Sequence, residues 1–298
     1  MQSALPQALD DLLPVRLLDT VVGRALEEDR GDGDLTSESA LPPGRSARAR
    51  LVAKQAGVLA GLPVFVRTFE LCDPGCQVET SRQDGDCLAE GETIATVVGD
   101  GRALLLAERT ALNFLQRMSG IATETARLVA IAAGRVRILD TRKTTPGLRA
   151  IEKYAVRCGG GENHRFGLFD EVMIKENHID LAGADVERVT RNVRAAVGDE
   201  IRMTVEARTQ AEAEAAVRGG ADVVLLDNMS PAEMARHVPG LRTLAGELGR
   251  ALELEASGGI DAGSLDAVAK SGVDRVSVGA LTHSAPSLDL SLYLEPRP

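Results

Sequence analysis

The chain has 298 residues, of which 44% are hydrophobic and only 2% aromatic, and it carries a formal net charge of -10. This length allows one barrel or two domains, with a core built from Leu, Val, Ile and Ala. The acidic charge and the scarcity of aromatic residues argue against a nucleic-acid partner. No stretch approaches the roughly 18 apolar residues that a membrane helix needs, so we expect no membrane partner.

The N-terminus and the cysteines both indicate a cytoplasmic protein. Residues 1–13 contain neither a basic segment nor a long apolar run, so they do not resemble a signal peptide. The chain has four cysteines, and none of them forms a C-x-x-C pair: Cys72, Cys76, Cys87 and Cys158. We therefore expect reduced structural thiols.

The first hundred residues or so predict a mixed α+β region. Val15, Leu18, Val22 and Leu26 have the spacing of an amphipathic helix, which the polar stretch 28–37 would end in a turn. Strands are then expected at 47–54, 77–80 and 93–98, with a short helix at 62–71. The clearest helix spans 102–119 and should end at Gly120, which places the domain boundary nearby.

From residue 136 onward, short apolar strands alternate with helical segments. Candidate strands are 136–139, 172–174, 201–205, 222–226, 252–255 and 274–278. Repeated βα units predict a parallel sheet, doubly wound or closed into a barrel. These are six strands, with another expected within 121–135, so we expect an α/β fold with an incomplete barrel.

Polar residues follow these strands at their C-terminal ends. Arg142 and Lys143 follow the first strand, Lys175 the second, Glu206 the third and Asp227 the fourth. Glycine-rich turns follow the last two strands, and His283 comes soon after. In an α/β barrel these strand ends converge on the face that carries the active site. The pattern therefore predicts one catalytic rim.

The stretch 136–175 is basic within an acidic chain. It contains eight Lys and Arg residues against five Asp and Glu. Such a basic region indicates a pocket for a small anionic ligand. Arg149, Lys153 and Arg157 have helical spacing and fit a solvated helix face instead. That explanation fails for the cations at strand and loop ends, which include Arg165.

Two glycine-rich turns are candidates for binding phosphate. Ser257-Gly258-Gly259 and Val278-Gly279-Ala280 follow the last two strands, where barrels commonly bind phosphate. Without bulky side chains, their N–H groups are free to point at an oxyanion. The alternative is that both are ordinary tight turns.

Glu206 and Asp227 predict a Mg²⁺ site. Two carboxylates at neighbouring strand ends suit a Mg²⁺ that keeps some waters and binds a substrate phosphate. The alternative is a pair of salt bridges to Lys143 or Lys175, and the two uses are compatible. General acid or base chemistry is less attractive, because nearby lysines would hold both groups ionised.

The motifs identify a family resemblance over nearly the whole chain. The segment DTRKTTPGLRAIEKYAVRCGGGENHRFGLFDEVMIKENH resembles the quinolinate phosphoribosyltransferases, the carboxylating nicotinate-nucleotide pyrophosphorylases. The segments EDRGDGDLTS, AERTALNFLQRMSGIAT and VEARTQAEAEAAVRGGADVVLLDNM fit the same family, as does the C-terminal part. The weakest fit is at Met203-Thr204, where family members often carry a further acidic residue.

The resemblance implies a fold of two domains and a dimeric enzyme. It implies an N-terminal α/β sandwich, residues 1–118 joined by the tail 285–298, and a seven-stranded incomplete α/β barrel, residues 119–284. The implied reaction joins quinolinate to phosphoribosyl pyrophosphate with Mg²⁺, giving nicotinate mononucleotide, pyrophosphate and CO₂ in NAD biosynthesis. The enzyme would be a homodimer or a larger oligomer with shared active sites.

The resemblance also assigns roles to residues. Arg142, His164, Arg165 and Lys175 would hold quinolinate, whose carboxylates suit arginine forks. Thr141 would also bind substrate. Lys143 would be catalytic together with the metal ligands Glu206 and Asp227, screening charge on the leaving pyrophosphate. The two glycine-rich turns would bind the 5′-phosphate, and His283 would also bind substrate. Arg109 would come from the neighbouring subunit.

Two alternative functions remain open from the residues. A barrel lyase or aldolase acting on a phosphosugar could use Lys143 or Lys175 as a Schiff base. A divergent homologue acting on another ligand would keep the fold but lose part of the quinolinate set. The additional cations favour a ligand with two carboxylates over a monocarboxylate such as nicotinate.

Overall fold

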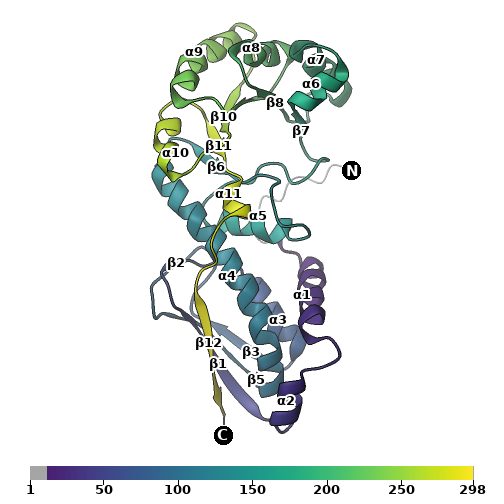
Figure 1. The fold of residues 1–298 in the computed structure, drawn as a ribbon, viewed down its shortest axis with the longest axis vertical. Coiled ribbons are helices and arrows are strands. Elements are labelled where there is room, and N and C mark those ends of the chain that lie inside the picture. Colours follow the sequence, from purple (N-terminus) through teal and green to yellow (C-terminus); the bar gives the residue numbers. More distant parts are fainter. Residues whose placement is uncertain (1–11, 298) are drawn as a thin grey trace. The chain divides into compact units, whose positions relative to one another are not determined.

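The computed structural model describes residues 12–297, which divide into two compact units (Figure 1). Unit 1 comprises residues 127–143 and 161–280, and unit 2 comprises residues 12–126, 144–160 and 281–297. Helix α4 (Gly101–Ala132) contributes to both units. The predicted boundary at residue 118 falls inside this helix, and the predicted domain division stays a prediction. The prediction that residues 1–13 are not a signal peptide falls mostly on residues 1–11, which lie outside the described residues.

Unit 1 is built on a parallel sheet of six strands in the order β6-β11-β10-β9-β8-β7. These strands are β6 (Arg137–Leu139), β7 (Val172–Ile174), β8 (Met203–Ala207), β9 (Val223–Asp227), β10 (Glu253–Ser257) and β11 (Arg275–Ser277). Every pair of neighbours is parallel. The predicted α/β class is confirmed.

The sheet has six named strands within the described residues, where the family resemblance implied seven. Glu162 adds only an isolated parallel bridge to Leu139 beside β6. The strand expected within 121–135 is wrong, because α4 continues to Ala132. Gly120 misled the prediction: it lies inside the helix, where a Cβ would be 1.9 Å from the carbonyl oxygen of Pro286. Glycine there permits close packing and does not end the helix.

Helices connect the strands of unit 1 and pack along its sheet (Figure 1). They are α6 (Glu176–Ala182), α7 (Val186–Val197), α8 (Gln210–Gly219), α9 (Pro231–Glu247) and α10 (Ala262–Ala269). Side chains at their starts satisfy the first N–H groups: Thr209 caps α8, and Ser230 and Glu233 form a capping box at α9. The short helix α11 (Ala280–His283) follows β11.

Unit 2 contains an antiparallel sheet with the order β12-β1-β5-β3. Its strands are β1 (Ser46–Ala53), β3 (Gln77–Thr80), β5 (Thr93–Asp100) and β12 (Leu290–Pro296), and β2 (Gly57–Val58) pairs separately with β4 (Cys87–Leu88). Strand β12 lies beside β1, from Ala47 opposite Pro296 to Ala53 opposite Leu290. The C-terminal segment therefore completes the sheet of this unit.

Unit 2 also contains helices, two of which supply residues to its hydrophobic core (Figure 1). They are α1 (Val15–Arg30), α2 (Leu35–Ala40), α3 (Leu62–Cys72), α5 (Arg149–Cys158) and the first part of α4. Phe65 and Phe69 of α3 are buried with Leu51, Ile94 and Leu104. Helix α2 was missed in the sequence, where its start reads as a turn; Asp34 caps it by accepting from the N–H groups of Thr36 and Ser37.

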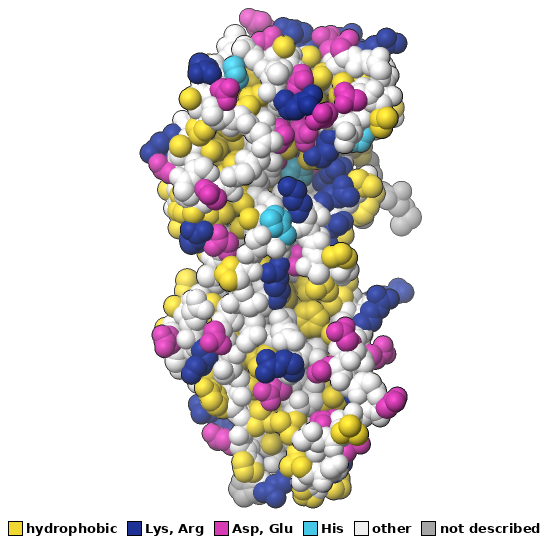
Figure 2. All heavy atoms as spheres, viewed as in Figure 1, with side chains coloured by type: hydrophobic (Ala, Val, Ile, Leu, Met, Phe, Trp, Pro, Cys, Tyr) yellow, Lys and Arg dark blue, Asp and Glu magenta, His cyan; other side chains and the backbone are white. Residues whose placement is uncertain are grey.

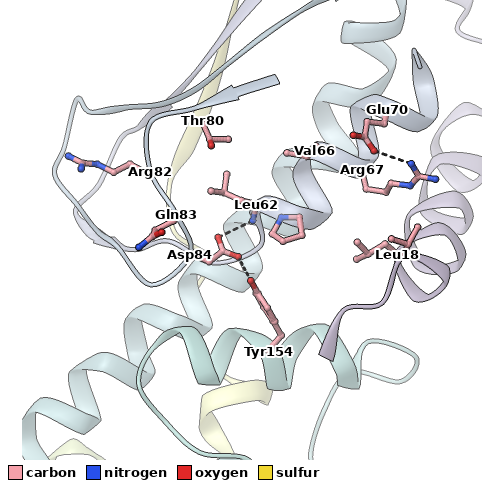
Figure 3. Close-up of a pocket in the computed structure, with 12 residues that line it drawn as sticks. Leu18, Leu62, Val66, Arg67, Glu70, Thr80, Arg82, Gln83, Asp84 and Tyr154 are labelled. Atoms are coloured by element: carbon pink, nitrogen blue, oxygen red, sulfur yellow. Dashed lines mark hydrogen bonds and ion pairs between the residues drawn. The ribbon is translucent and has the colours of Figure 1, made fainter. Parts of the chain in front are cut away.

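A cavity of about 560 Å³ lies in unit 2, and Figure 3 shows its lining. The carboxylate of Asp84 accepts N–H groups of Gly61 and Leu62, at 2.8 and 3.0 Å, and the hydroxyl of Tyr154 at 2.7 Å. Burial raises the pKa of Asp84, against the effect of these hydrogen bonds. Asp84 thus ties the start of α3 to α5, and its oxygens are engaged in structure. None of the predicted site residues lines this cavity.

One predicted helix face is not solvated as expected. Lys153 of α5 is fully buried, whereas Arg157 on the same helix is exposed. The sequence showed that Arg149, Lys153 and Arg157 have helical spacing. It did not show which side of α5 packs into unit 2, and Lys153 lies on that side. No helix within the described residues has the length and apolar character to cross a membrane.

Candidate active site

The strand ends of unit 1 surround a cavity of about 370 Å³. Most of the predicted site residues line it: Thr141, Arg142, Lys143, His164, Arg165, Lys175, Glu206, Asp227, Ser257, Gly258 and Gly259. Lys and Arg side chains also gather over part of unit 1 in Figure 2, with Asp and Glu side chains beside them. The parallel strands bring these residues together, although they are spread over more than a hundred positions of sequence.

The second glycine-rich turn does not line this cavity. Val278, Gly279 and Ala280 belong to unit 1 and follow β11, but they are absent from the cavity wall. The N–H of Val278 donates to the carbonyl of Leu139 at 2.9 Å, which continues the pairing of β11 with β6. This amide is therefore used by the sheet and is not offered to an anion.

Arg109 and His283 lie in unit 2. Arg109 lies on α4 and lines a separate cavity of about 300 Å³ with Asn113 and Phe114. His283 is exposed at the end of α11, with Nδ1 2.6 Å from Oγ of Ser284. The participation of Arg109 in a shared site and the binding of substrate by His283 stay predictions.

Arg142 and Arg165 place two guanidinium groups in one cavity wall. Burial lowers the pKa of Arg165, and the positive charge of Arg142 lowers it further. The Nε atom of Arg142 is buried and has no hydrogen-bond partner among the described residues. Two neighbouring positive charges repel each other, and a buried donor without an acceptor is costly. An anion bound between the two guanidinium groups would relieve both costs. This pair therefore suits a ligand with carboxylate or phosphate groups.

Lys175 and Glu206 form an ion pair at the edge of the cavity. Nζ of Lys175 lies 2.6 Å from Oε2 of Glu206, and the lysine side chain is 46% exposed. An ion pair this accessible contributes little to stability and is readily rearranged by a ligand. Of the salt bridges that the sequence left open, the one from Lys175 to Glu206 is present. The backbone N–H of Lys143 donates to Oγ1 of Thr141 at 3.0 Å.

The turn after β10 requires glycine for two reasons. Gly258 and Gly259 have φ angles of +101° and +59°, which favour glycine. A Cβ on Gly258 would also lie 2.3 Å from Oδ1 of Asn228, the residue after β9. Asn228 in turn donates from Nδ2 to Oδ2 of Asp227 at 2.8 Å. The two strand ends therefore pack directly on one another. Successive N–H groups in a glycine turn of this shape can point at an anion, and phosphate binding here stays a prediction.

The residues present fit a Mg²⁺ that is only partly bound by protein. Glu206 lies one residue before the end of β8, Asp227 is the last residue of the neighbouring strand β9, and both line the same cavity. Within residues 12–297 there is no cluster of three or more acidic, His or Cys side chains that could enclose a metal. A pair of carboxylates suits Mg²⁺, which keeps several waters and takes further oxygens from phosphates.

Sequence reasoning missed several residues of the cavity wall: Met173, Leu225, Asn228, Glu255 and Ser277. Asn228 was adjacent to a predicted residue and followed the same strand. Glu255 was the last residue of the predicted strand 252–255 and was given no role. The sequence did contain a signal for this residue: a Glu in a strand of a buried parallel sheet is seldom buried unless it has a charged or polar partner.

The fold and this cavity define a class of protein: an α/β enzyme that binds small anionic molecules at the carboxyl ends of its parallel strands. Residues 34–119 match the model for the N-terminal domain of quinolinate phosphoribosyl transferase, and residues 121–293 match the model for its C-terminal domain. The chain belongs to the quinolinate phosphoribosyl transferase family.

Individual relatives agree with this assignment. The chain is 46% identical to a probable nicotinate-nucleotide pyrophosphorylase [carboxylating] of Bacillus subtilis over 89% of each chain. It is 38% identical to quinolinate phosphoribosyltransferase [decarboxylating] 1b of Nicotiana tabacum, over 95% of this chain and 83% of the relative. Among solved structures, NadC from Streptococcus pyogenes superimposes with a TM-score of 0.90 at 39% identity, covering 96% of this chain and 99% of NadC.

Proposed function

We propose that the protein transfers the phosphoribosyl group of phosphoribosyl pyrophosphate to quinolinate, with decarboxylation. The products are nicotinate mononucleotide, pyrophosphate and CO₂. The observation that carries the proposal is the combination, in one cavity, of the Arg142 and Arg165 guanidinium pair with the open turn Ser257-Gly258-Gly259. The first suits the two carboxylates of quinolinate, and the second suits a phosphate.

The chemistry follows from charge. The quinolinate ring nitrogen attacks C1′ of the ribose as the bond from C1′ to pyrophosphate breaks, which yields a pyridinium. The bond to the carboxylate beside that nitrogen then breaks and releases CO₂. Its electron pair remains on the ring carbon, stabilised by the adjacent cationic nitrogen, until a proton is taken up. No covalent bond to the protein is required.

The side chains would position the substrates and neutralise their charges. Arg142, Arg165 and Lys175 would hold the carboxylates of quinolinate, and Lys143 would face the negative charge that develops on pyrophosphate. Glu206 and Asp227 would hold Mg²⁺, which supplies charge neutralisation of the phosphates when bound. Lys175 already contacts Glu206, so the two substrate sites share one electrostatic network.

We also infer a homodimer in a cytoplasmic setting, with Arg109 supplied to the site by the neighbouring subunit. Family membership and the position of Arg109 on the wall of its own cavity in unit 2 support this inference. The Schiff-base alternative is less well supported, because Lys175 is ion-paired and not the free amine that attacks a carbonyl. Borohydride trapping with a sugar phosphate should leave no adduct.

The proposal is tested by turnover with defined substrates. Purified protein with quinolinate, phosphoribosyl pyrophosphate and MgCl₂ should form nicotinate mononucleotide and equimolar pyrophosphate. Nicotinate in place of quinolinate should react far more slowly. Absence of nucleotide product, or a preference for nicotinate, would overturn the proposal.

A further inference from the structure

A fully buried carboxylate forms part of the cavity wall. Glu255 stands in the middle of β10, has no exposed surface, and lines the cavity together with the cationic residues. An ionised carboxylate is costly to bury without partners, and a negative charge is unexpected in the wall of an anion-binding cavity. The roles proposed above do not use this residue.

Glu255 has two partners that belong to different parts of unit 1. Its Oε2 lies 2.8 Å from Nε of Arg275, on the neighbouring strand β11, and 3.4 Å from Nε2 of His164. Burial by itself would raise the pKa of Glu255, but His164 and Arg275 outweigh it and the pKa is lowered. Glu255 is therefore an anion that contacts one residue of the predicted ligand set and one residue of the sheet.

His164 is held from several directions. Its Nδ1 accepts the backbone N–H of Arg165 at 2.7 Å, and its own backbone N–H donates to Oδ1 of Asp140 at 2.9 Å. A nitrogen that accepts a hydrogen bond carries no proton, so the ring proton lies on Nε2, which faces Glu255. Glu171 is the second carboxylate near the ring, 3.6 Å from Nδ1.

These contacts link Glu255 to the arginine that follows His164. The charge of Glu255 attracts the imidazole ring, with Oε2 3.4 Å from Nε2, and Nδ1 of the ring accepts the backbone N–H of Arg165. The Arg165 side chain is further held by its Nη1, which donates to the carbonyl of Glu171 at 3.3 Å. Loss of the Glu255 charge would free the ring to rotate and would loosen the backbone that sets the direction of Arg165.

We propose that Glu255 is a positioning residue for the pyridine dicarboxylate, acting through His164 on Arg165. The inference rests on the proposed function. It predicts an effect on the half of the cavity that binds quinolinate and little effect on the half that binds phosphoribosyl pyrophosphate, which the Ser257-Gly258-Gly259 turn would hold.

Steady-state kinetics separates this role from a general structural one. Glu255→Gln keeps the size of the side chain and removes its charge, and we expect it to raise the KM for quinolinate at least about tenfold. The KM for phosphoribosyl pyrophosphate should change less than about threefold, since Glu255 contacts His164 and Arg275, which lie outside the glycine turn. Equal changes in both constants, or an unchanged KM for quinolinate, would overturn the proposal.

Glu253→Gln is the matched control. Glu253 lies two residues earlier on the same strand and on the same face, and it pairs with Arg137, Arg202 and Arg275, but it does not line the cavity. Its replacement should leave the KM for quinolinate unchanged. If Glu253→Gln raised that KM as much as Glu255→Gln does, the effect would belong to the arginine network and the proposal would fail.

A measurement on the unmodified protein completes the test. The chain has only four histidines, so ¹⁵N spectra of the imidazole rings are readily assigned with a His164→Asn variant. We expect His164 in the ligand-free protein to carry its proton on Nε2, and a proton on Nδ1 alone would contradict the proposal. This readout requires no turnover and no stable Glu255 variant. It therefore distinguishes failure of this inference from failure of the proposed function, which the wild-type assay reports.

Discussion

Nζ of Lys175 lies 2.6 Å from Oε2 of Glu206, which joins a cation proposed to hold quinolinate to a carboxylate proposed to hold Mg²⁺. Lys175 directly follows β7, and Glu206 lies one residue before the end of β8, which pairs with β7 in parallel. Any cation that binds Glu206 weakens its hold on Lys175, and any anion that attracts Lys175 frees Glu206. The ion pair thus couples the two halves of the cavity electrostatically.

The metal proposal predicts a shift in Mg²⁺ dependence. Asp227→Asn removes one of two candidate metal carboxylates, and we expect roughly tenfold more Mg²⁺ to be needed for half-maximal rate. Asp266→Asn is the control, since Asp266 is half-exposed on α10, pairs with Lys270 and lies outside the cavity. A Mg²⁺ titration of initial rates measures both variants. An Asp227→Asn curve that overlays the wild-type curve would show that this carboxylate does not hold the metal.

The shared-site proposal predicts complementation between two inactive variants. Arg109→Ala and Lys143→Ala should each abolish turnover while keeping the fold, because each removes a charge that the substrates require. After random subunit exchange, half of the dimers are mixed and one of their two sites is whole, so about a quarter of wild-type activity should return. Differently tagged subunits verify the exchange. No recovery despite verified exchange would place Arg109 outside the partner's site, and a near-normal rate for Lys143→Ala alone would refute its catalytic role.

Arg142 should contribute to binding at the expense of stability. Arg142→Ala removes the charge that lowers the pKa of Arg165 and a buried Nε without a partner. We expect the KM for quinolinate to rise roughly 10–100-fold, while the Tm stays the same or increases. Arg135→Ala, which removes an ion pair to Asp266 outside the cavity, should leave the KM unchanged. A Tm that falls by several degrees with an unchanged KM would identify Arg142 as structural.

Gly258 should be essential for the phosphate turn. Gly258→Ala places a Cβ at φ +101° and 2.3 Å from Oδ1 of Asn228, so the turn must move. We expect a loss of roughly 1–3 kcal/mol in stability and a raised KM for phosphoribosyl pyrophosphate. Gly198→Ala also places a Cβ at a positive φ, +77°, but with open space around it, and should affect stability alone. Denaturant unfolding and kinetics on both variants measure the difference, and equal kinetic effects would remove the turn from the site.

Gly120 should matter for folding and not for chemistry. A Cβ there would meet the carbonyl oxygen of Pro286 at 1.9 Å, so Gly120→Ala should destabilise the protein by roughly 1–3 kcal/mol or more. Gly240 lies in α9 with nothing near its added Cβ, and Gly240→Ala should stabilise by about 0.5–1 kcal/mol. Chemical denaturation reports both. If Gly120→Ala were as stable as wild type, α4 would not pack against the 286–287 backbone this closely.

The sequence predicts the fold of unit 1 well because local pattern and tertiary structure agree there. All six expected parallel strands exist, and polar residues cluster at their carboxyl ends as the βα alternation implies. The strand ends were less accurate. Strands β8 and β10 end two residues later than expected, and β9 ends one residue later. Glu206, Asp227 and Ser257 resemble loop residues in the sequence, but they pair within the sheet.

What the sequence could not predict depends on contacts between distant segments. Gly120 resembles a helix terminator, and only its contact with Pro286 explains why glycine continues a helix there. Lys153 and Glu255 are buried charges, which a periodicity argument assigns to a solvated face or to an ordinary strand. The N–H of Val278 was expected to be free to bind an oxyanion. It donates instead to the carbonyl of Leu139 and continues the sheet, a contact between distant segments that the sequence does not reveal.

The location of quinolinate in a complex tests the central claim most directly. A crystal structure of the protein with quinolinate should show the ligand in the cavity of unit 1, with its carboxylates against the guanidinium groups of Arg142 and Arg165 and near Lys175. Quinolinate bound elsewhere, for example beside Asp84 and Tyr154 in the larger cavity of unit 2, would contradict the account.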